Sequence, residues 1–390
     1  MALQPSSMTA AAAKAKAIAS LWTFPSVIFS AVLIAWAAEA GQFLISQGFA
    51  LAILAWLQTL PEFVVEGIIA WEQNVPLMAA NFTGAIRLLV GFGWPMIYFT
   101  TVIFQRPPRW QDRFVRVSLE GEHAIGILAL LPPVLYFVIV VLKGTLSLFD
   151  AFILLTMYGT YLWLVQKVPP KEVETIEDLS TVPRHILGLR PWLRNLSIIG
   201  LFAIGGTTLF FLAEPFVHSM LGLAMILGVS EFVFVQWVAP FLSEFPEKVS
   251  AFYWARTVKK APMAIMNMVS SSVNEWTVLA SVLPIVYSIS RGEPSTVHFD
   301  THQRIEILLT VVQSLLGFLL LANLEFRWHE AAGLFILWAV QFIMPDIREE
   351  IIFVYGAWAA IELLRGTLGR RKLRVFGEVA MIWRTHVRKR

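Results

Sequence analysis

Two Pro-Glu pairs lie in the middle of long apolar runs of this 390-residue chain. The first is Pro61-Glu62, in LAWLQTLPEFVVEG, and the second is Pro246-Glu247, in VQWVAPFLSEFPEKVSA. Each run has about 30 residues, more than the ~20 that a helix needs to cross a bilayer. A proline breaks the helix there, and a carboxylate inside a membrane is costly unless it has a partner such as a cation. Two such sites in corresponding halves predict inverted repeats with a cation site at the midplane, formed by Glu62 and Glu247.

Two further acids share a helix face with these glutamates. Glu66 lies one helical turn after Glu62, and Glu244 lies three residues before Glu247. Spacings of three and four residues bring side chains together on a helix. Two carboxylates this close cannot both ionise easily in a poor dielectric, which suits a site that binds or releases protons. Each acid could instead face a pocket of interfacial water.

Each broken helix is followed by a helix that begins with a small polar cluster. The two stretches are AANFTGAIRLLVGFGWP, residues 79–95, and IMNMVSSSVNEWTVLASVLP, residues 265–284. Oxygen atoms are the ligands that hard cations prefer, although serine and threonine also occur at tight helix contacts. The candidate ligands in these two stretches are Asn81, Thr83, Ser271, Ser272, Asn274 and Glu275. Glu231 and Gln236 lie earlier in the second broken helix, on no certain face, and are not assigned to the site.

Arg87 is an unusual residue for the membrane interior. A guanidinium group cannot be deprotonated, so it needs a partner there. We expect Arg87 to be the charge partner of the site, paired with one of the glutamates Glu62, Glu66, Glu244, Glu247 and Glu275. In that position it would neutralise one acid permanently and take the place of a bound cation.

The composition indicates a polytopic helical membrane protein whose surroundings are the lipid bilayer. Hydrophobic residues make up 57% of the chain and charged residues 15%, against roughly 25% charged residues in soluble proteins. The chain has no cysteine, which excludes disulfides and thiol chemistry. It has no nucleotide-phosphate loop and no histidine pair with metal-ligand spacing. We therefore expect no enzyme activity, no nucleic-acid partner and no cofactor apart from transported cations such as Ca²⁺, Na⁺ or H⁺. The sequence does not indicate an oligomeric state.

Apolar runs of spanning length predict eleven helices, the first of them retained rather than cleaved. They cover residues 18–38, 43–71, 77–104, 123–142, 146–165, 193–213, 217–254, 262–290, 304–322, 329–345 and 349–365. The polar stretch 166–192, rich in proline and charge, reads as a linker between two halves of five helices. The predicted units are therefore 1–165 (with its central part at about 43–104), 166–192, 193–345 (central part about 217–290), and 346–390 with an extra helix and a basic tail.

The two halves repeat beyond the Pro-Glu pairs. Asn81 follows Glu62 by 19 residues, and Asn267 follows Glu247 by 20. The fifth helix of each half also begins with an acid, Asp150 in the first half and Glu330 in the second. An odd number of helices in each half makes the halves insert in opposite directions. The predicted fold is thus all-α, with two inverted five-helix repeats and an eleventh helix.

Lysine and arginine residues near the span ends predict the orientation. Four basic segments fall on one side if there are eleven helices: the loop around 106–116, the linker, the loop 256–260 and the tail 370–390. This arrangement puts the C-terminus and the linker in the cytoplasm and the N-terminus outside, in the cell (inner) membrane. The tail itself reads either as an amphipathic helix on the anionic leaflet or as a disordered topogenic segment.

In these features the chain resembles the sodium/calcium exchanger (cation/calcium antiporter) superfamily. LGVSEFVFVQWVAPFLSEFPEKVSA is similar to the second alpha-repeat of that family, and LAWLQTLPEFVVEG to the first. NFTGAIR and NMVSSSVNE occupy the place of its Asn-x-x-Gly-Ser-Asn motif. The resemblance covers about residues 18–345. It implies an antiporter that moves a cation, typically calcium, against sodium or protons, with the two Pro-Glu glutamates coordinating the ions.

The chain also departs from that family's motifs. Gln58-Thr59-Leu60 and Ser243-Glu244-Phe245 replace the Thr-Ser before each Pro-Glu pair. Calcium takes about six to eight oxygen ligands, and the first half offers few. The leading expectation is a calcium antiporter driven by sodium or protons through alternating access. The alternatives are a monovalent cation/proton exchanger and a non-transporting membrane scaffold or sensor on the same fold.

Overall fold

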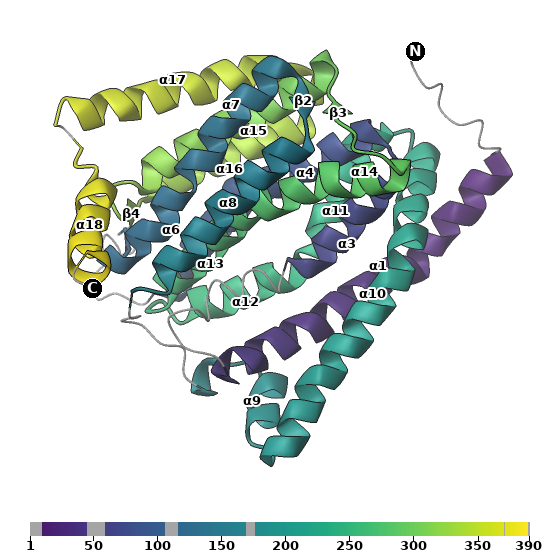
Figure 1. Ribbon diagram of the computed structural model, residues 1–390, viewed down its shortest axis with the longest axis horizontal. Helices are drawn as coiled ribbons and strands as arrows, with labels where there is room; N and C mark the ends of the chain where they lie inside the picture. Colours follow the sequence, from purple (N-terminus) through teal and green to yellow (C-terminus); the bar gives the residue numbers. More distant parts are fainter. Residues whose placement is uncertain (1–9, 45–58, 106–115, 169–175, 370, 389–390) are drawn as a thin grey trace.

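A computed structural model describes residues 10–44, 59–105, 116–168, 176–369 and 371–388, and helices make up most of it (Figure 1). The first half contains α1 (Ala10–Gly41), η1 (Gln42–Leu44), α3 (Leu60–Trp71), α4 (Val75–Leu88), the π-helical turn η2 (Leu89–Gly93), α5 (Trp94–Phe104), β1 (Val117–Ser118), η4 (Gly121–His123), α6 (Ala124–Ala129), α7 (Leu131–Lys143), β2 (Thr145–Leu146) and α8 (Leu148–Val165). The linker adds η5 (Ile176–Asp178) and α9 (Thr181–Leu187).

The second half repeats this order. It contains α10 (Pro191–Leu227), α11 (Glu231–Ser243), α12 (Phe245–Arg256), α13 (Ala261–Asn274), the π-helical turn η6 (Glu275–Leu279), α14 (Ala280–Arg291), β3 (Val297–His298), α15 (Thr301–Leu321), β4 (Glu325–Phe326) and α16 (Trp328–Ile343). The C-terminal part adds η7 (Pro345–Ile347), α17 (Arg348–Thr367), α18 (Arg374–Ile382) and η8 (Trp383–Val387).

Two short antiparallel ribbons join the halves and reveal their symmetry. β1 pairs with β4, and β2 pairs with β3. β1 and β2 flank the fourth helix of the first half, as β3 and β4 flank the fourth helix of the second. A twofold axis that exchanges the halves therefore turns one ribbon into the other. The π-helical turns obey the same symmetry, because η2 and η6 each begin eight residues after an asparagine, Asn81 or Asn267. The predicted all-α fold with two inverted five-helix repeats is confirmed.

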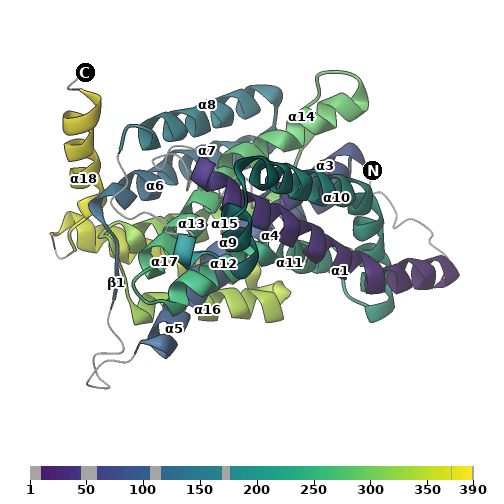
Figure 2. The same ribbon diagram turned by 90° about the horizontal axis from the view of Figure 1, so that it is seen from below.

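The distribution of polar and apolar side chains is that of a membrane protein. α4 and α13 lie at the centre, and almost all their residues are buried, including the polar ones. Large apolar side chains on the outer helices are exposed instead, such as Phe152 on α8 and Phe210 on α10 (67% and 62%). The long helices α1 and α10 run side by side along one flank in both views (Figures 1 and 2). Exposed apolar surface on these helices is what contact with lipid requires.

Six of the described helical segments are long and apolar enough to cross a membrane. The pair Trp328–Ile343 and Pro345–Thr367 also meets this criterion as a unit but is bent by 118°. α16 and α17 are therefore two helices, as predicted. The predicted spans that contain the Pro-Glu pairs do not meet the criterion within the described residues, because the described pieces α3, α11 and α12 have only 12, 13 and 12 residues.

One predicted boundary is wrong. The sequence placed a break near residues 214–216, between runs 193–213 and 217–254, but α10 continues through Pro215 to Leu227. A proline inside a membrane helix is tolerated when neighbouring groups satisfy the freed carbonyl. The helix ends at Gly228, which adopts the left-handed conformation (φ 67°) that favours glycine after a helix end.

The linker and the tail carry more structure than a solvated loop. In the linker, α9 buries Pro183 and Ile186 and packs against α1. In the tail, α18 buries Val375 and Ile382 and packs against α6. The tail is thus folded over residues 371–388, with helix from Arg374 to Val387, which rules out the disordered interpretation for that part.

Candidate functional site

Each Pro-Glu pair begins a new helix in the interior of the molecule. Pro61 is the second residue of α3 and Pro246 the second residue of α12. Proline is favourable there because the first turn of a helix has no partner for its N–H groups. Glu62 and Glu247 consequently sit in the first turns of these helices. The positive end of the helix dipole and the free amides of that turn stabilise a carboxylate.

Three of the predicted acids meet in the centre. Glu62 at the start of α3, Glu244 between α11 and α12, and Glu275 at the start of η6 each offer an oxygen, and these atoms lie within 4.8 Å of one another. All three side chains are buried. The two Pro-Glu breaks, far apart in the sequence, therefore come together in one place. The three residues together could hold a single metal ion.

The oxygens around this cluster are largely unpartnered within the described part of the chain. Both carboxylate oxygens of Glu62, Glu247 and Glu275 are buried without a hydrogen bond, as is one oxygen of Glu66 and of Glu244. Side-chain oxygens of Asn81, Ser271 and Asn274 are also buried without a hydrogen bond. Burying a charged or polar oxygen without a partner is expensive. A site for a cation that takes six or more oxygen ligands would have this many unpartnered oxygens in one region.

Two hydrogen bonds fix the amide side chains so that their oxygens stay available. Asn81 Nδ2 donates to Glu66 Oε2, and Asn274 Nδ2 donates to the Thr59 hydroxyl. Both asparagines thus use their donors on the residues around the first Pro-Glu break. Their Oδ1 atoms accept no hydrogen bond from the described residues.

Lys248 is a basic residue of the cluster that the sequence analysis missed. Its ammonium donates to Glu244 Oε2, and its side chain is only 5% exposed. It lies one turn after Glu244 on the same helix face, so the i,i+4 spacing of opposite charges was a signal that could have identified the pair. The equivalent positions of the first half hold Thr59 and Phe63. The second half therefore adds an acid and a base that the first half lacks.

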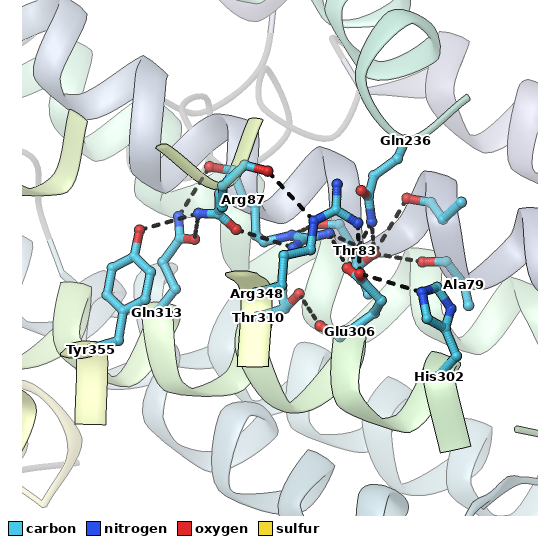
Figure 3. Close-up of polar contacts among 12 residues, drawn as sticks. Ala79, Thr83, Arg87, Gln236, His302, Glu306, Thr310, Gln313, Arg348 and Tyr355 are labelled. Atoms are coloured by element: carbon cyan, nitrogen blue, oxygen red, sulfur yellow. Dashed lines mark hydrogen bonds and ion pairs between the residues drawn. The ribbon is translucent and has the colours of Figure 1, made fainter. Parts of the chain in front are cut away.

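Arg87 is paired with a different acid from the ones predicted. Its Nη2 donates to Glu306 Oε2 on α15 at 2.6 Å, and Arg348 Nη1 on α17 donates to Glu306 Oε1 at 2.6 Å (Figure 3). Arg87 and Glu306 are both buried. The expectation that Arg87 pairs with one of the glutamates of the cluster is thus wrong: its carboxylate comes from the helix predicted over 304–322, to which no site residue was assigned.

Two more of the predicted ligands have their hydroxyls engaged elsewhere. Thr83 Oγ1 donates to the Ala79 carbonyl and accepts from Gln236 Nε2, so it belongs to the Arg87 network (Figure 3). Ser272 Oγ donates to the Met268 carbonyl. Gln236, left unassigned from the sequence, also donates to Glu306 Oε2 at 3.0 Å. It ties α11 to α4 and α15.

Two inverted halves around a buried, oxygen-rich cluster define a polytopic membrane transporter. A sequence model of the family described as sodium/calcium exchanger protein matches residues 15–167 and 197–344. The chain therefore belongs to the sodium/calcium exchanger family, and this makes it a cation/calcium antiporter of the membrane.

Solved structures agree with that assignment. The chain is similar to the crystal structure of the H⁺/Ca²⁺ exchanger CAX, with 32% identity and a TM-score of 0.85 over 96% of this chain and 91% of that one. It also shares its fold with structures of the sodium-calcium exchanger NCX_Mj. Two of these have 16% identity, TM-scores of 0.54 and 0.57, and coverage of 86% and 85% of this chain and 99% of the other. No curated protein sequence matches the chain.

Proposed function

We propose that this antiporter exchanges Ca²⁺ for protons at the cluster of Glu62, Glu244, Glu247 and Glu275. The observation that carries the proposal is the meeting of three buried carboxylates within 4.8 Å, with most of their oxygens unpartnered among the described residues. Ca²⁺ is a hard cation that carboxylate and amide oxygens bind well. The unpartnered oxygens of Asn81, Ser271 and Asn274 would complete its shell.

The charge of the cluster favours protons as the counter-ion. Four ionised carboxylates and the Lys248 ammonium leave an excess of three negative charges, of which a bound Ca²⁺ offsets two. When Ca²⁺ leaves, buried acids this close must take up cations or protons. A proton needs only one carboxylate oxygen, whereas each sodium ion would need its own shell of ligands. The similarity to an H⁺/Ca²⁺ exchanger supports the same choice.

A cavity offers a route to the cluster along α12. It has a volume of about 640 Å³, and its lining includes Phe245, Val249 and Tyr253, at successive turns of that helix. Phe245 follows Glu244 directly in the chain, so the lining comes within one residue of the cluster. Arg256 and Glu177, near the other end, belong to segments predicted to be cytoplasmic. In an alternating-access cycle this would be the cytoplasmic route, closed when the opposite side opens.

The test is Ca²⁺ flux into vesicles that contain the purified protein, without sodium and with a proton gradient. We expect Ca²⁺ uptake coupled to proton movement in the opposite direction. Glu62→Gln and Glu247→Gln should each abolish exchange, because the amide can neither be ionised nor carry the exchanged proton. Glu293→Gln removes a carboxylate that is 66% exposed and is the matched control, with exchange retained. Exchange at the original rate in Glu62→Gln would overturn the proposal, and uptake that requires a sodium gradient would replace the proton by sodium.

A monovalent cation/proton exchanger is the second candidate, and Lys248 favours it. A fixed ammonium within the cluster lowers the negative charge that a divalent ion would use. The same vesicles distinguish the two: Na⁺ or K⁺ movement driven by the proton gradient, with no Ca²⁺ uptake, would identify the monovalent exchanger.

A further inference from the structure

A second polar cavity lies far from the carboxylate cluster, where three separate segments of the chain meet. It has a volume of about 410 Å³ and is formed by Arg116 just before β1, the turn from α15 to α16, and the end of α17 with the start of α18. In the orientation expected from the sequence, all three segments are cytoplasmic. Six basic side chains line it: Arg116, Arg327, Arg365, Arg371, Lys372 and Arg374.

The three acids of this cavity are already paired. Glu325 accepts from Arg116 and from Arg327, both at 2.9 Å. Glu330 and Glu362 each accept from Arg371, at 2.7 and 2.6 Å, and Glu362 also accepts from Arg365 at 2.8 Å. Six cations against three carboxylates leave an excess of three positive charges. Although burial alone would raise it, the pKa of Glu325 is held below its ordinary value by Arg327, Arg116 and Arg374.

The walls of the cavity are held in place. Arg371 is 12% exposed and donates from Nη2 to the Leu320 carbonyl at 2.6 Å. The backbone N–H of Val375 donates to the Ala322 carbonyl, so the start of α18 is fixed to the end of α15. Arg371 Nε is a buried donor with no hydrogen-bond partner in the described part of the chain. A fixed cavity with excess guanidinium groups and an unused donor matches a phosphate group, because guanidinium recognises phosphate oxygens in a planar fork.

The cavity also has the right position for a membrane-surface ligand. α18 and η8, which follow directly, bury Val375 and Ile382 against the bundle and leave Phe376, Met381 and Trp383 about half exposed. Exposed apolar side chains on a basic amphipathic helix are typical of the membrane interface. Basic pockets on the cytoplasmic side bind the headgroups of anionic lipids.

We propose that this cavity is a binding site for a phosphate group, supplied by an anionic lipid headgroup or by free phosphate. The bound group would offset the excess charge and join the loop before α6, the turn before α16 and the C-terminal helix. It would stabilise the cytoplasmic face of the antiporter independently of the ion site.

The test compares two double variants that lose the same charge from the same tail. Lys372→Gln/Arg374→Gln removes two cations from the cavity lining, and Arg384→Gln/Arg388→Gln removes two from outside it. Arg371 is left intact because its ion pairs hold the fold together. Each full-length protein is placed in phosphatidylcholine nanodiscs, with and without phosphatidylglycerol, and lipid retention is measured by native mass spectrometry. Thermal unfolding in phosphatidylcholine alone checks that both variants are folded.

We expect the unmodified protein and the Arg384/Arg388 variant to retain phosphatidylglycerol in preference to phosphatidylcholine. The Lys372/Arg374 variant should lose this preference by about thirtyfold, since each of the two basic residues near an anionic headgroup contributes a factor of about five. A rise in Tm with millimolar inorganic phosphate in phosphatidylcholine, lost only in the Lys372/Arg374 variant, would identify free phosphate as the source. Equal losses in both variants, or binding by neither the lipid nor phosphate, would overturn the proposal.

Discussion

The charge of Lys248 affects how strongly the carboxylate cluster binds a cation. Its ammonium occupies one oxygen of Glu244 and lies within the same buried region as the other acids. A tethered cation of this kind competes with a bound one for the same oxygens. The equivalent position in the first half is Phe63, so this competition comes from one half alone.

Replacing Lys248 with glutamine should tighten Ca²⁺ binding by about tenfold, a change of ~1.4 kcal/mol. The reason is that Glu244 Oε2 becomes free to bind the ion. Without Ca²⁺ the same variant should unfold at a lower temperature, because a buried acid without its partner costs about 3–5 kcal/mol. Isothermal titration with Ca²⁺ and thermal unfolding measure the two effects. Glu244→Gln/Lys248→Gln, which removes the pair together, is the control for stability and should keep the original Tm without Ca²⁺. Its Ca²⁺ binding should not tighten, because it also loses a carboxylate of the cluster. Unchanged Ca²⁺ affinity in Lys248→Gln would mean that the ammonium does not compete with the ion.

The residues of the site differ in how far the sequence could predict them. Glu62, Glu247 and Glu275 stand out because acids are rare in apolar runs, and the structure places them around one cluster; their role as ion ligands stays a prediction. The partner of Arg87 could not be found in this way. Glu306 is 219 residues away in the chain, and its pairing depends on which faces of α4 and α15 meet. Thr83 and Ser272 show the same limit, because a hydroxyl can return to its own helix backbone.

At the scale of elements, Glu306 holds the extra helix α17 onto the repeats. It lies between Arg87 on α4 and Arg348 at the start of α17, and Gln236 on α11 also donates to it. Four helices therefore depend on one buried carboxylate, which is 2% exposed. The eleventh helix is anchored by this ion pair on one side and by Arg371 on the other.

Glu306→Gln should lower the stability of the protein by about 3–5 kcal/mol, because it leaves two buried guanidinium groups without a carboxylate. Thermal unfolding in nanodiscs measures the loss. Glu293→Gln, which removes the acid of an exposed ion pair, should change stability by only about 0–1 kcal/mol. Equal Tm values for Glu306→Gln and the unmodified protein would show that the triad is not an anchor.

The ribbons give a second prediction at this scale. Thr145 and His298 face each other across β2 and β3, and the chain has no cysteine of its own. A disulfide between Thr145→Cys and His298→Cys should form and leave ion exchange intact, because the ribbon joins parts that stay together during the cycle. Flux in vesicles before and after reduction measures this. Exchange that stops on oxidation and returns on reduction would mean that the ribbon opens.

Element boundaries show why a run of hydrophobicity is an incomplete guide. The break predicted between runs 193–213 and 217–254 contains Glu214-Pro215, yet α10 passes through that proline. α10 ends because Gly228 adopts a left-handed backbone conformation, and a pattern of apolar residues does not predict such a conformation. The broken helices were predictable because proline and glutamate fell together in the middle of a span.

At the scale of the whole molecule, the structure groups the basic segments in a way that fits the expected orientation. Arg116 from the loop after α5, Arg327 from the turn before α16 and Arg371 from the tail all line one cavity. Segments that share a cavity at the surface must lie on the same side of the membrane. The positive-inside rule then predicts that this side is cytoplasmic.

A fluorescent reporter fused after Arg390 should therefore be fluorescent, and an alkaline phosphatase fused there should be inactive, since the first folds in the cytoplasm and the second outside. Fusions at the N-terminus should give the opposite pattern. An active phosphatase at the C-terminus would place the basic cavity outside and reverse the orientation.

The exchanged ribbons carry a consequence for how such a chain can originate. The first short strand of each half pairs with the second short strand of the other half, so the same contact between the halves occurs twice. Two separate copies of one ancestral half could have made both contacts with each other, as an antiparallel homodimer with a twofold axis. After fusion of the two genes, the sequence of each half could change independently of the other. The pair Glu244–Lys248, present in one half where the other has Thr59 and Phe63, is a difference that a symmetric dimer could never have acquired on one side.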